Sequence, residues 1–307
     1  MSELRRHAED YLSLRRALGY KLVGEARLLA SFVTSLEEAG VSRIGTEVAV
    51  TWACTVTGST AYLARRMRVA RGFARYVHSL DPSTEVPPAD LFPAGKHRPV
   101  PYIYSDDDVL SLMGAARTLG PPLRALTLES LIGLLAATGM RVSEAMALDD
   151  GDLDWRNGLV TVRNSKYNKS RELLLHPTTV EALRAYRAKR DRLGPIRLTP
   201  SLFVSSRGSR LCHETVQPAF RQLVRRAGLV QPPSSPQPRI HGLRHTFAVN
   251  TLLSWYRDGG DVAARMPLLS TYLGHVDIAA TYWYLSAVPE LLALAARRLE
   301  RTEGEQP

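Results

Sequence analysis

The sequence contains few cysteines and no long apolar segment. Cys54 and Cys212 are its only cysteines and lie far apart, which argues against a disulfide framework or a thiolate zinc site. No stretch approaches the run of about 18 apolar residues that a membrane helix needs. The first residues, MSELRRHAEDY, lack the apolar core of a secretory signal. These absences predict a chain without a membrane span, in the reducing cytoplasm.

Acidic residues are outnumbered by basic ones. The 307 residues include 40 Lys and Arg against 30 Asp and Glu, for a formal net charge of +10. Such an excess favours a polyanionic partner, because cations that neutralise phosphates release the counterions condensed on a nucleic acid. Taken alone, it is equally compatible with a protein that is merely basic. The length and an apolar fraction of 45% predict a folded protein of two domains.

The chain divides by composition into three zones and a tail. Residues 1–80 have a helical pattern of apolar residues, with Gly40 and Gly58 where helices should end. Residues 81–103 contain prolines at 82, 87, 88, 93, 99 and 101 and are expected to form an extended linker. Residues 104–300 are the second predicted domain, and 301–307 are a flexible tail.

The second domain is predicted to be mostly helical with a small antiparallel sheet. Ser105 can cap a helix whose first turn carries the acids of 106–108. Two β-type runs, 158–162 and 171–175, flank a polar turn and indicate a hairpin. A helix over 290–298 could dock on a neighbouring copy or on its own core. The fold class is therefore mainly α (α+β), with an all-α N-terminal domain.

Four arginines of the first domain recur at helical spacing. They are Arg65, Arg68, Arg71 and Arg75. Residues three or four apart share a helical face, and no acid precedes these arginines by four positions to neutralise them. A solvated helix face is the alternative explanation. We favour contact with the DNA backbone.

Two segments of the second domain carry cations suited to phosphate. Arg141 lies at a predicted helix start, where main-chain N–H groups and an Arg fork both suit an anion, and Glu144 could hold its guanidinium. Such a pair by itself is usually a surface ion pair. Lys166 and Lys169 lie in the hairpin turn and could reach a DNA groove or protonate a leaving oxygen. Most turn lysines, however, are only solvated.

Histidines and tyrosines complete the set of candidates. His241 and Arg244 are three residues apart, which places an imidazole beside a permanent positive charge. His241 and His245 are four apart, but no Glu follows His241 and no acid cluster lies nearby, so a metal site is disfavoured. His275 then precedes an aromatic segment that ends at Tyr284.

The order of these residues resembles that of the tyrosine recombinase (phage integrase) family, over about residues 104–296. The matching motifs are Thr-Gly-x-Arg-x-Ser-Glu, a lysine in a downstream hairpin, His-x-Leu-Arg-His, and Leu-Gly-His followed after nine residues by tyrosine. The N-terminal helices resemble the family's SAM-like core-binding domain. The resemblance implies six catalytic residues and one supporting acid: Arg141 with Glu144 in support, Lys166, His241, Arg244, His275 and the nucleophile Tyr284.

The sequence departs from the family pattern at three places. The hairpin turn reads Ser165-Lys166-Tyr167 instead of the common Gly-Lys-Gly, so Lys169 is a second candidate for the catalytic lysine. Residues 254–267 form a longer stretch than usual before the Leu-Gly-His motif. Tyr282 lies close to Tyr284, so the choice of nucleophile depends on the nine-residue spacing.

The resemblance implies a reaction without metal, cofactor or ATP. Tyr284 would form a 3′-phosphotyrosyl bond and release a 5′ hydroxyl, and that bond would retain the energy needed for rejoining. Arg141 and Arg244 would hold the non-bridging oxygens, His241 would take the phenolic proton, and Lys166 would protonate the leaving oxygen.

The partners would be double-stranded DNA and further copies of the chain, in a tetramer on two DNA sites. Integration, transposition, cassette exchange and chromosome resolution all use such a site. A topoisomerase and a DNA-binding protein without catalysis are the alternatives.

Overall fold

The computed structural model describes residues 2–92, 100–163, 170–194, 198–287 and 289–294. The chain divides into two compact units, Met1–Arg98 and Pro99–Pro307. This division falls within the segment 81–103 that the prolines mark. No described helix has both the length and the apolar character that crossing a membrane requires.

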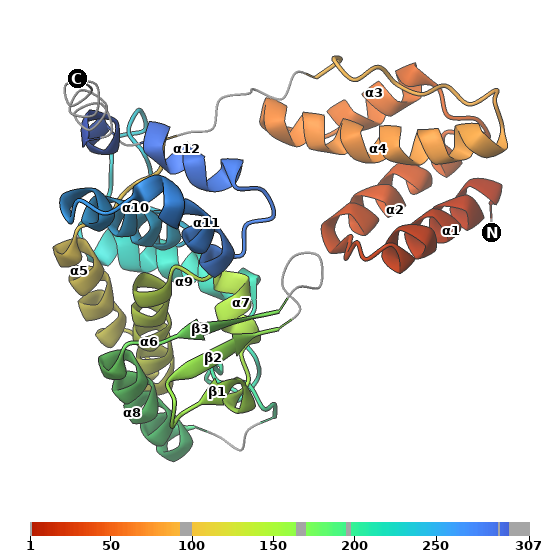
Figure 1. Ribbon diagram of the computed structural model, residues 1–307. Helices are drawn as coiled ribbons and strands as arrows, with labels where there is room; N and C mark the ends of the chain where they lie inside the picture. The colour runs from red at the N-terminus through yellow and green to blue at the C-terminus, as the bar shows by residue number, and fades with distance from the viewer. Residues whose placement is uncertain (1, 93–99, 164–169, 195–197, 288, 295–307) are drawn as a thin grey trace, which may run out of the picture. The chain divides into compact units, whose positions relative to one another are not determined.

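The described part of the N-terminal unit is all helical (Figure 1). Its helices are α1 (Glu3–Ala17), α2 (Val23–Glu38), α3 (Thr46–Cys54) and α4 (Thr60–Leu80). They bury an aromatic and aliphatic core that includes Phe32, Trp52 and Phe73. As expected, α2 ends just before Gly40, which adopts the left-handed conformation that glycine tolerates best. Gly58 instead lies in the loop after α3, ahead of the Ser59 cap of α4.

The first half of the predicted linker belongs to the N-terminal unit. The main-chain N–H of Glu85 donates to the carbonyl of Ile44 at 2.9 Å, and Thr84 is buried. Arg71 Nε donates to the carbonyl of Pro87 at 2.8 Å. The carbonyl is the only main-chain hydrogen-bonding group of a proline, and here the carbonyls of Pro87 and Pro88 accept from the Arg71 side chain. Proline content alone did not show that residues 81–88 pack against the helices before them.

The C-terminal unit is a helical assembly with one small sheet (Figure 1). Its helices are α5 (Asp106–Arg117), α6 (Pro122–Thr138), α7 (Val142–Ala147), α8 (Pro177–Leu193), α9 (His213–Arg226), α10 (Gly242–Arg257), α11 (Val262–Leu273) and α12 (Ala279–Ala287), with a 3-10 turn at Asp150–Asp152. The predicted Ser105 cap is confirmed as a capping box with Asp108. Helix α6 is apolar around its circumference because it packs against α5, α8 and α10.

The sheet has the order β1-β2-β3, with both pairs antiparallel. Its strands are β1 (Leu153–Asp154), β2 (Leu159–Val162) and β3 (Arg171–Leu174). The predicted hairpin is confirmed by β2 and β3, which pair in the register Val160↔Leu173 and Val162↔Arg171. Two residues are too few to give β1 a recognisable alternation, so the sequence did not predict it. Lys166 and Lys169 lie outside the described residues.

Helices α10, α11 and α12 form a second apolar cluster in this unit. Helix α10 serves both clusters, because Leu243 packs with α6 and Ala248 packs with α11 and α12. Arg244 is therefore held between two cores. Leu291 is fully buried in the second cluster. This part of the predicted 290–298 helix therefore packs against the core of its own chain. Residues 295–298 lie outside the described part. Together with the N-terminal helices, these elements confirm the mainly α fold class.

Candidate active site

Three arginines converge on the C-terminal end of α11. Helix α11 ends at Leu273, and Gly274 closes it with a φ of +67°. The last carbonyls of a helix lack helical partners and carry the negative end of its dipole, so cations stabilise them. Three consecutive carbonyls here accept from three different guanidiniums: Tyr272 O from Arg171 Nε at 2.8 Å, Leu273 O from Arg244 Nη2 at 2.7 Å, and Gly274 O from Arg141 Nη2 at 2.9 Å.

Arg141 is positioned by the start of α7. It is the N-cap residue of that helix, and its main-chain N–H donates to Glu144 Oε2 at 2.9 Å. Its guanidinium also donates to Glu144 Oε1 at 2.7 Å. The Arg141–Glu144 contact expected from the sequence is therefore present. It differs from an ordinary surface pair because the Glu144 side chain is only 6% exposed.

Glu144 also binds a second arginine. Arg171, the first residue of β3, donates Nη1 to Oε1 at 3.1 Å and Nη2 to Oε2 at 2.9 Å, which is a two-pronged contact. Burial alone would raise the pKa of this carboxyl group. The hydrogen bonds and charge of Arg171, followed by the bonds from Arg141, outweigh burial and lower the pKa of Glu144 to about 2. Glu144 is thus a buried carboxylate shared by two cations.

Arg244 is the most enclosed of the three arginines. It lies in the first turn of α10, is 2% exposed, and donates to the carbonyl of Gly139 at 2.9 Å as well as to α11. No carboxylate among the described residues forms an ion pair with it. Burial, followed by the neighbouring charge of Arg141, lowers the pKa of Arg244 to about 10. A buried cation that donates its hydrogen bonds to carbonyls, with no carboxylate paired directly to it among the described residues, is well suited to receiving an anion.

Tyr284 is buried among the histidine rings of the same region. The side chain, on α12, is 2% exposed, and its hydroxyl forms a 3.2 Å hydrogen bond with His245 Nδ1. The ring of His241 lies edge-on to that of His245, with centroids 4.8 Å apart. His275 is nearly parallel to the Tyr284 ring, at 6.3 Å between centroids, and its Nδ1 bonds to Thr281 Oγ1 at 2.7 Å. A phenol, imidazoles and guanidiniums are thus gathered in one place.

The two candidate tyrosines of α12 differ in their environment. Tyr282 is 44% exposed, whereas Tyr284 lies in the apolar cluster and contacts His245. A difference of two positions turns a helical side chain by about 200°, which explains the opposite directions. Tyr284 is the tyrosine on the side of the histidines.

The structure brings together all the candidate residues of this unit that it describes, and two more that sequence reasoning left without a role. His245 belongs to the His-x-Leu-Arg-His motif, and its four-residue spacing from His241 was considered only for metal binding. Arg171 was considered only as part of a strand. Its contacts are with residues 27 and 101 positions away, so no local pattern could have identified them. Within the described part of the chain, no group of three or more His, Cys, Asp or Glu side chains could hold a metal ion.

The arginines on α4 have diverse surroundings. Arg65 pairs with Glu25 of α2 at 3.2 Å, which corrects the expectation that the stripe is unneutralised, because the acid comes from another helix. Arg71 binds the carbonyls of Pro87 and Pro88. No hydrogen bond or ion pair joins Arg68 or Arg75 to another residue of the described part. With Arg15, Arg71 and Tyr11 of the same unit, these two line a cavity of about 400 Å³.

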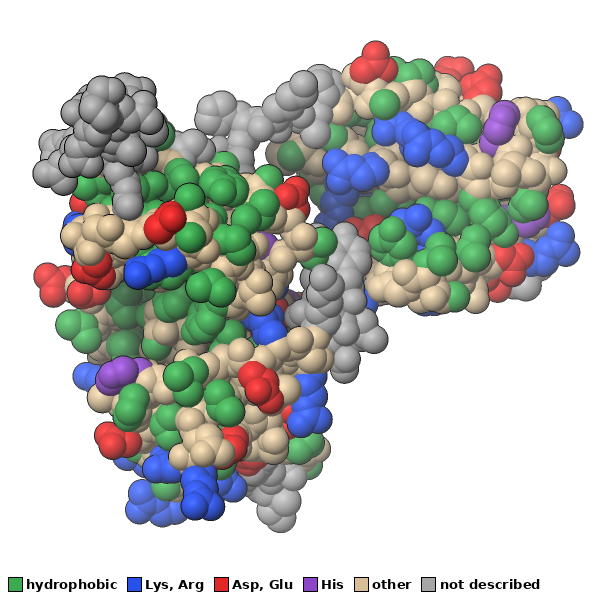
Figure 2. All heavy atoms as spheres, viewed as in Figure 1, with side chains coloured by type: hydrophobic (Ala, Val, Ile, Leu, Met, Phe, Trp, Pro, Cys, Tyr) green, Lys and Arg blue, Asp and Glu red, His purple; other side chains and the backbone are tan. Residues whose placement is uncertain are grey.

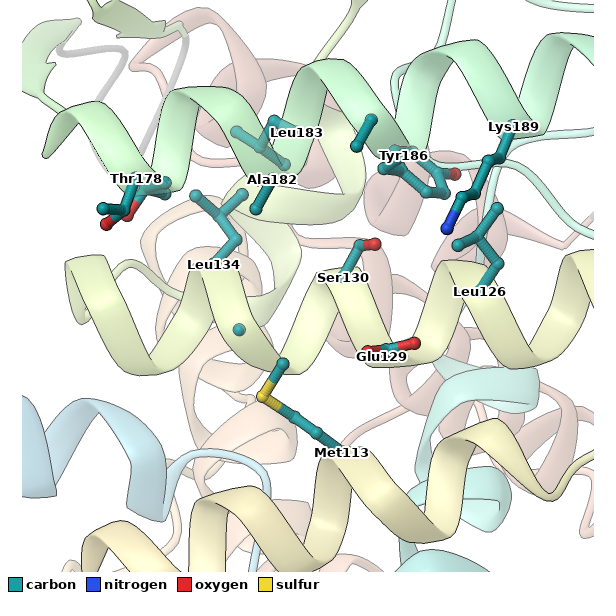
Figure 3. Close-up of a pocket in the computed structure, with 13 residues that line it drawn as sticks. Met113, Leu126, Glu129, Ser130, Leu134, Thr178, Ala182, Leu183, Tyr186 and Lys189 are labelled. Carbon is teal, nitrogen blue, oxygen red and sulfur yellow. The ribbon is translucent and has the colours of Figure 1, made fainter.

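Other surface features lie apart from this chemistry. Lys and Arg side chains occur in groups on the visible face of both units (Figure 2). A groove of about 400 Å³ between α6 and α8 is lined by apolar residues together with Glu129 and Lys189 (Figure 3). None of the candidate catalytic residues lines this groove. We therefore assign the chemistry to the end of α11.

Comparisons with known proteins identify the family of the chain. The model of the phage integrase family matches residues 103–290. The protein y4rB of Sinorhizobium fredii, classed by its name with integrases and recombinases, is 39% identical over 308 residues, or 98% of each chain. The tyrosine recombinase XerC of Mycobacterium leprae is 31% identical over 83% of this chain and 84% of its own. Among solved structures, the Tn1549 transposon integrase bound to transposon end DNA has a TM-score of 0.65, with 16% identity and coverage of 96% and 98%.

Proposed function

This chain belongs to the phage integrase family, and on that premise we propose that it is a site-specific DNA recombinase whose nucleophile is Tyr284. The observation that carries the assignment is the gathering of Tyr284, His245, Arg141 and Arg244 at the end of α11. Tyr284 comes from α12, Arg244 and His245 from α10, and Arg141 from the start of α7, so their meeting in space is not a consequence of one local pattern.

The reaction exchanges one phosphodiester for another. The Tyr284 hydroxyl oxygen attacks the phosphorus, the bond to the 5′ oxygen of the next nucleotide breaks, and a 3′-phosphotyrosyl bond forms. The phenolic proton passes to an imidazole: His241 by family resemblance, or His245, which already bonds the hydroxyl. The 5′ oxygen takes a proton from Lys166 or Lys169. Reversal of these steps by another 5′ hydroxyl rejoins the strand.

Arg141 and Arg244 stabilise the charge that develops on phosphorus oxygens. Each guanidinium has five N–H donors, so binding a main-chain carbonyl leaves donors for phosphate. The low exposure of Arg244 strengthens this effect, because charges interact more strongly where water is excluded. His275 would complete the phosphate contacts from the loop that follows α11.

The proposal is tested by capturing the covalent intermediate. The protein is incubated with duplexes that carry a randomised core of about forty base pairs, denatured, and the protein-linked DNA is recovered and sequenced. Wild type and Tyr282→Phe should give linked DNA and define a cleavage site, because the side chain of Tyr282 points away from the histidines. Tyr284→Phe should give none. Linked DNA that persists in Tyr284→Phe and disappears in Tyr282→Phe would refute the choice of nucleophile.

We infer that double-stranded DNA is the partner and that the active assembly is a tetramer on two sites. Solved neighbours include recombinases bound to DNA, among them XerH with its difH substrate, which supports the DNA partner. The tetramer follows from the family resemblance, since two strand exchanges need four nucleophiles. Mass photometry of the protein with the selected duplex should show four protomers with two duplexes. Complexes that never exceed two protomers would contradict the tetramer.

A further inference from the structure

Arg171 joins three parts of the active site that are far apart in the sequence. As the first residue of β3 it reaches Glu144 on α7 through both terminal nitrogens and the end of α11 through Nε. Its side chain is only 12% exposed. It belongs to none of the sequence motifs that identified the other site residues.

The guanidinium of Arg171 is packed closely against the main chain at Gly274. A Cβ atom built on Gly274 would lie 2.8 Å from Arg171 Nη1 and 3.1 Å from its Cζ. The guanidinium therefore lies directly against the main chain of the turn that begins the Leu-Gly-His motif. Arg141 binds the same Glu144 carboxylate and the carbonyl of Gly274, whereas Arg171 binds the carbonyl of Tyr272, so each guanidinium is held by Glu144 and by a carbonyl at the end of α11.

We propose that Arg171 is a positioning residue for strand cleavage, which fixes Glu144 and the end of α11 so that Arg141 and His275 are presented to the phosphate. This inference rests on the proposed recombinase function. Arg171 does not touch the substrate; it acts through Arg141, through the Leu273–His275 turn, and through the hairpin whose second strand it begins. The predicted catalytic lysines, Lys166 and Lys169, lie in the segment immediately before Ser170 and Arg171.

The chemistry of arginine explains why this position would not accept lysine. A planar guanidinium can bond both oxygens of Glu144 and still direct Nε at the carbonyl of Tyr272, whereas an ammonium is a point charge with no fixed fork. Loss of Arg171 would leave Glu144 held by Arg141 alone, in a site from which water is largely excluded. The carboxylate would then draw Arg141 away from its place at Gly274.

The experiment compares Arg171→Gln and Arg171→Lys with Arg210→Gln. Arg210 is a matched control, because it also bridges a carboxylate and helix-end carbonyls: it bonds Asp149, and the carbonyls of Met146 and Ala147 at the end of α7. Among the described residues, it forms no hydrogen bond or ion pair with Glu144 or α11. For each variant, the single-turnover rate of covalent complex formation on the selected duplex is measured together with its DNA affinity and Tm.

Arg171→Gln should lower the cleavage rate about 10- to 100-fold, as loss of supporting contacts typically does, while DNA affinity changes less than about twofold. Arg171→Lys should recover only part of the rate. Arg210→Gln should cleave at the wild-type rate even if its Tm falls equally. Glu144→Gln added to Arg171→Gln should lower the rate less than about threefold further, because both changes disable one unit.

Two outcomes would overturn the inference while leaving the recombinase function intact. In one, Arg171→Gln cleaves as fast as Arg210→Gln at equal Tm. In the other, the slower cleavage by Arg171→Gln is fully explained by weaker DNA binding. If wild type itself forms no covalent complex with any duplex, the proposed function fails instead, so the two failures are distinguishable.

Discussion

At the scale of single residues, the site is defined by an imbalance of buried charge. Arg141, Arg171 and Arg244 contribute three positive charges, and Glu144, which pairs with Arg141 and Arg171, is the one carboxylate of the described residues that binds any of them. The cluster therefore carries a local charge of +2. Uncompensated charge in a buried place is costly, and helix-end carbonyls offset it only in part. A phosphodiester would complete the balance, which explains how binding and catalysis can use the same residues.

The ionisation of Glu144 predicts a specific acid sensitivity. Its pKa is lowered from an ordinary value of 4.5 to about 2 in the folded protein. A lowered folded-state pKa means that the stabilisation is present above about pH 4.5 and is lost as the pH falls towards about 2. From the pKa difference this amounts to about 3 kcal/mol in the free energy of unfolding.

Urea unfolding of wild type and Glu144→Gln at several pH values measures this contribution. The two proteins should differ by about 3 kcal/mol at pH 7, and the difference should shrink below about pH 4.5. Because all other carboxylates are common to both proteins, their titration cancels in the comparison. A difference that stays constant down to pH 2 would show that the Glu144 carboxylate is not the group responsible.

At the scale of elements, the end of α11 is the part on which the arginines depend. The left-handed φ of Gly274 costs an L-residue about 1–2 kcal/mol by itself. Gly228, which follows α9, has a similar φ of +71° but open space around its Cα.

Gly228→Ala should therefore show the conformational cost alone, measured as a loss in the free energy of unfolding. Gly274→Ala should lose more stability and also cleave DNA more slowly, because its Cβ would displace Arg171. Equal effects of the two substitutions would argue against the close packing.

Helix α4 carries both a buried arginine, which packs in the fold, and exposed arginines, which we propose contact DNA. Arg66 is buried, with its guanidinium 4.0 Å from the centre of the Trp52 ring, while Arg68 and Arg75 are exposed. Arg68→Ala and Arg75→Ala should each weaken binding to any duplex and reduce the slope of log affinity against log salt by about 0.9 per lost phosphate contact. Fluorescence anisotropy over a range of NaCl concentrations gives these slopes.

Arg65→Ala is the internal control on the same helix face, because Arg65 already pairs with Glu25. Its salt slope should change less than that of Arg68→Ala. Unchanged slopes in both Arg68→Ala and Arg75→Ala would exclude this face of α4 from DNA contact.

At the scale of the whole molecule, the sequence predicted the fold class, and its short-range patterns singled out candidate residues that the structure brings together at the end of α11. Arg141 with Glu144, and His241 with Arg244, lie within one helical turn and are recognisable as pairs. Arg171, His245 and the Arg65–Glu25 pair were missed or left without a role, because their partners come from distant parts of the chain. The cytoplasmic location inferred from cysteine content stays a prediction.

The burial of Tyr284 also has a chemical consequence for the protein without DNA. Because the Tyr284 side chain is only 2% exposed, the proposed reaction would require α12 to shift before the phenol could reach a phosphodiester. The same shielding excludes reagents dissolved in water. Brief treatment with tetranitromethane should nitrate Tyr282, which is 44% exposed, and leave Tyr284 intact, as peptide mass spectrometry would reveal. Early nitration of Tyr284 would mean that the nucleophile is already accessible in the resting protein.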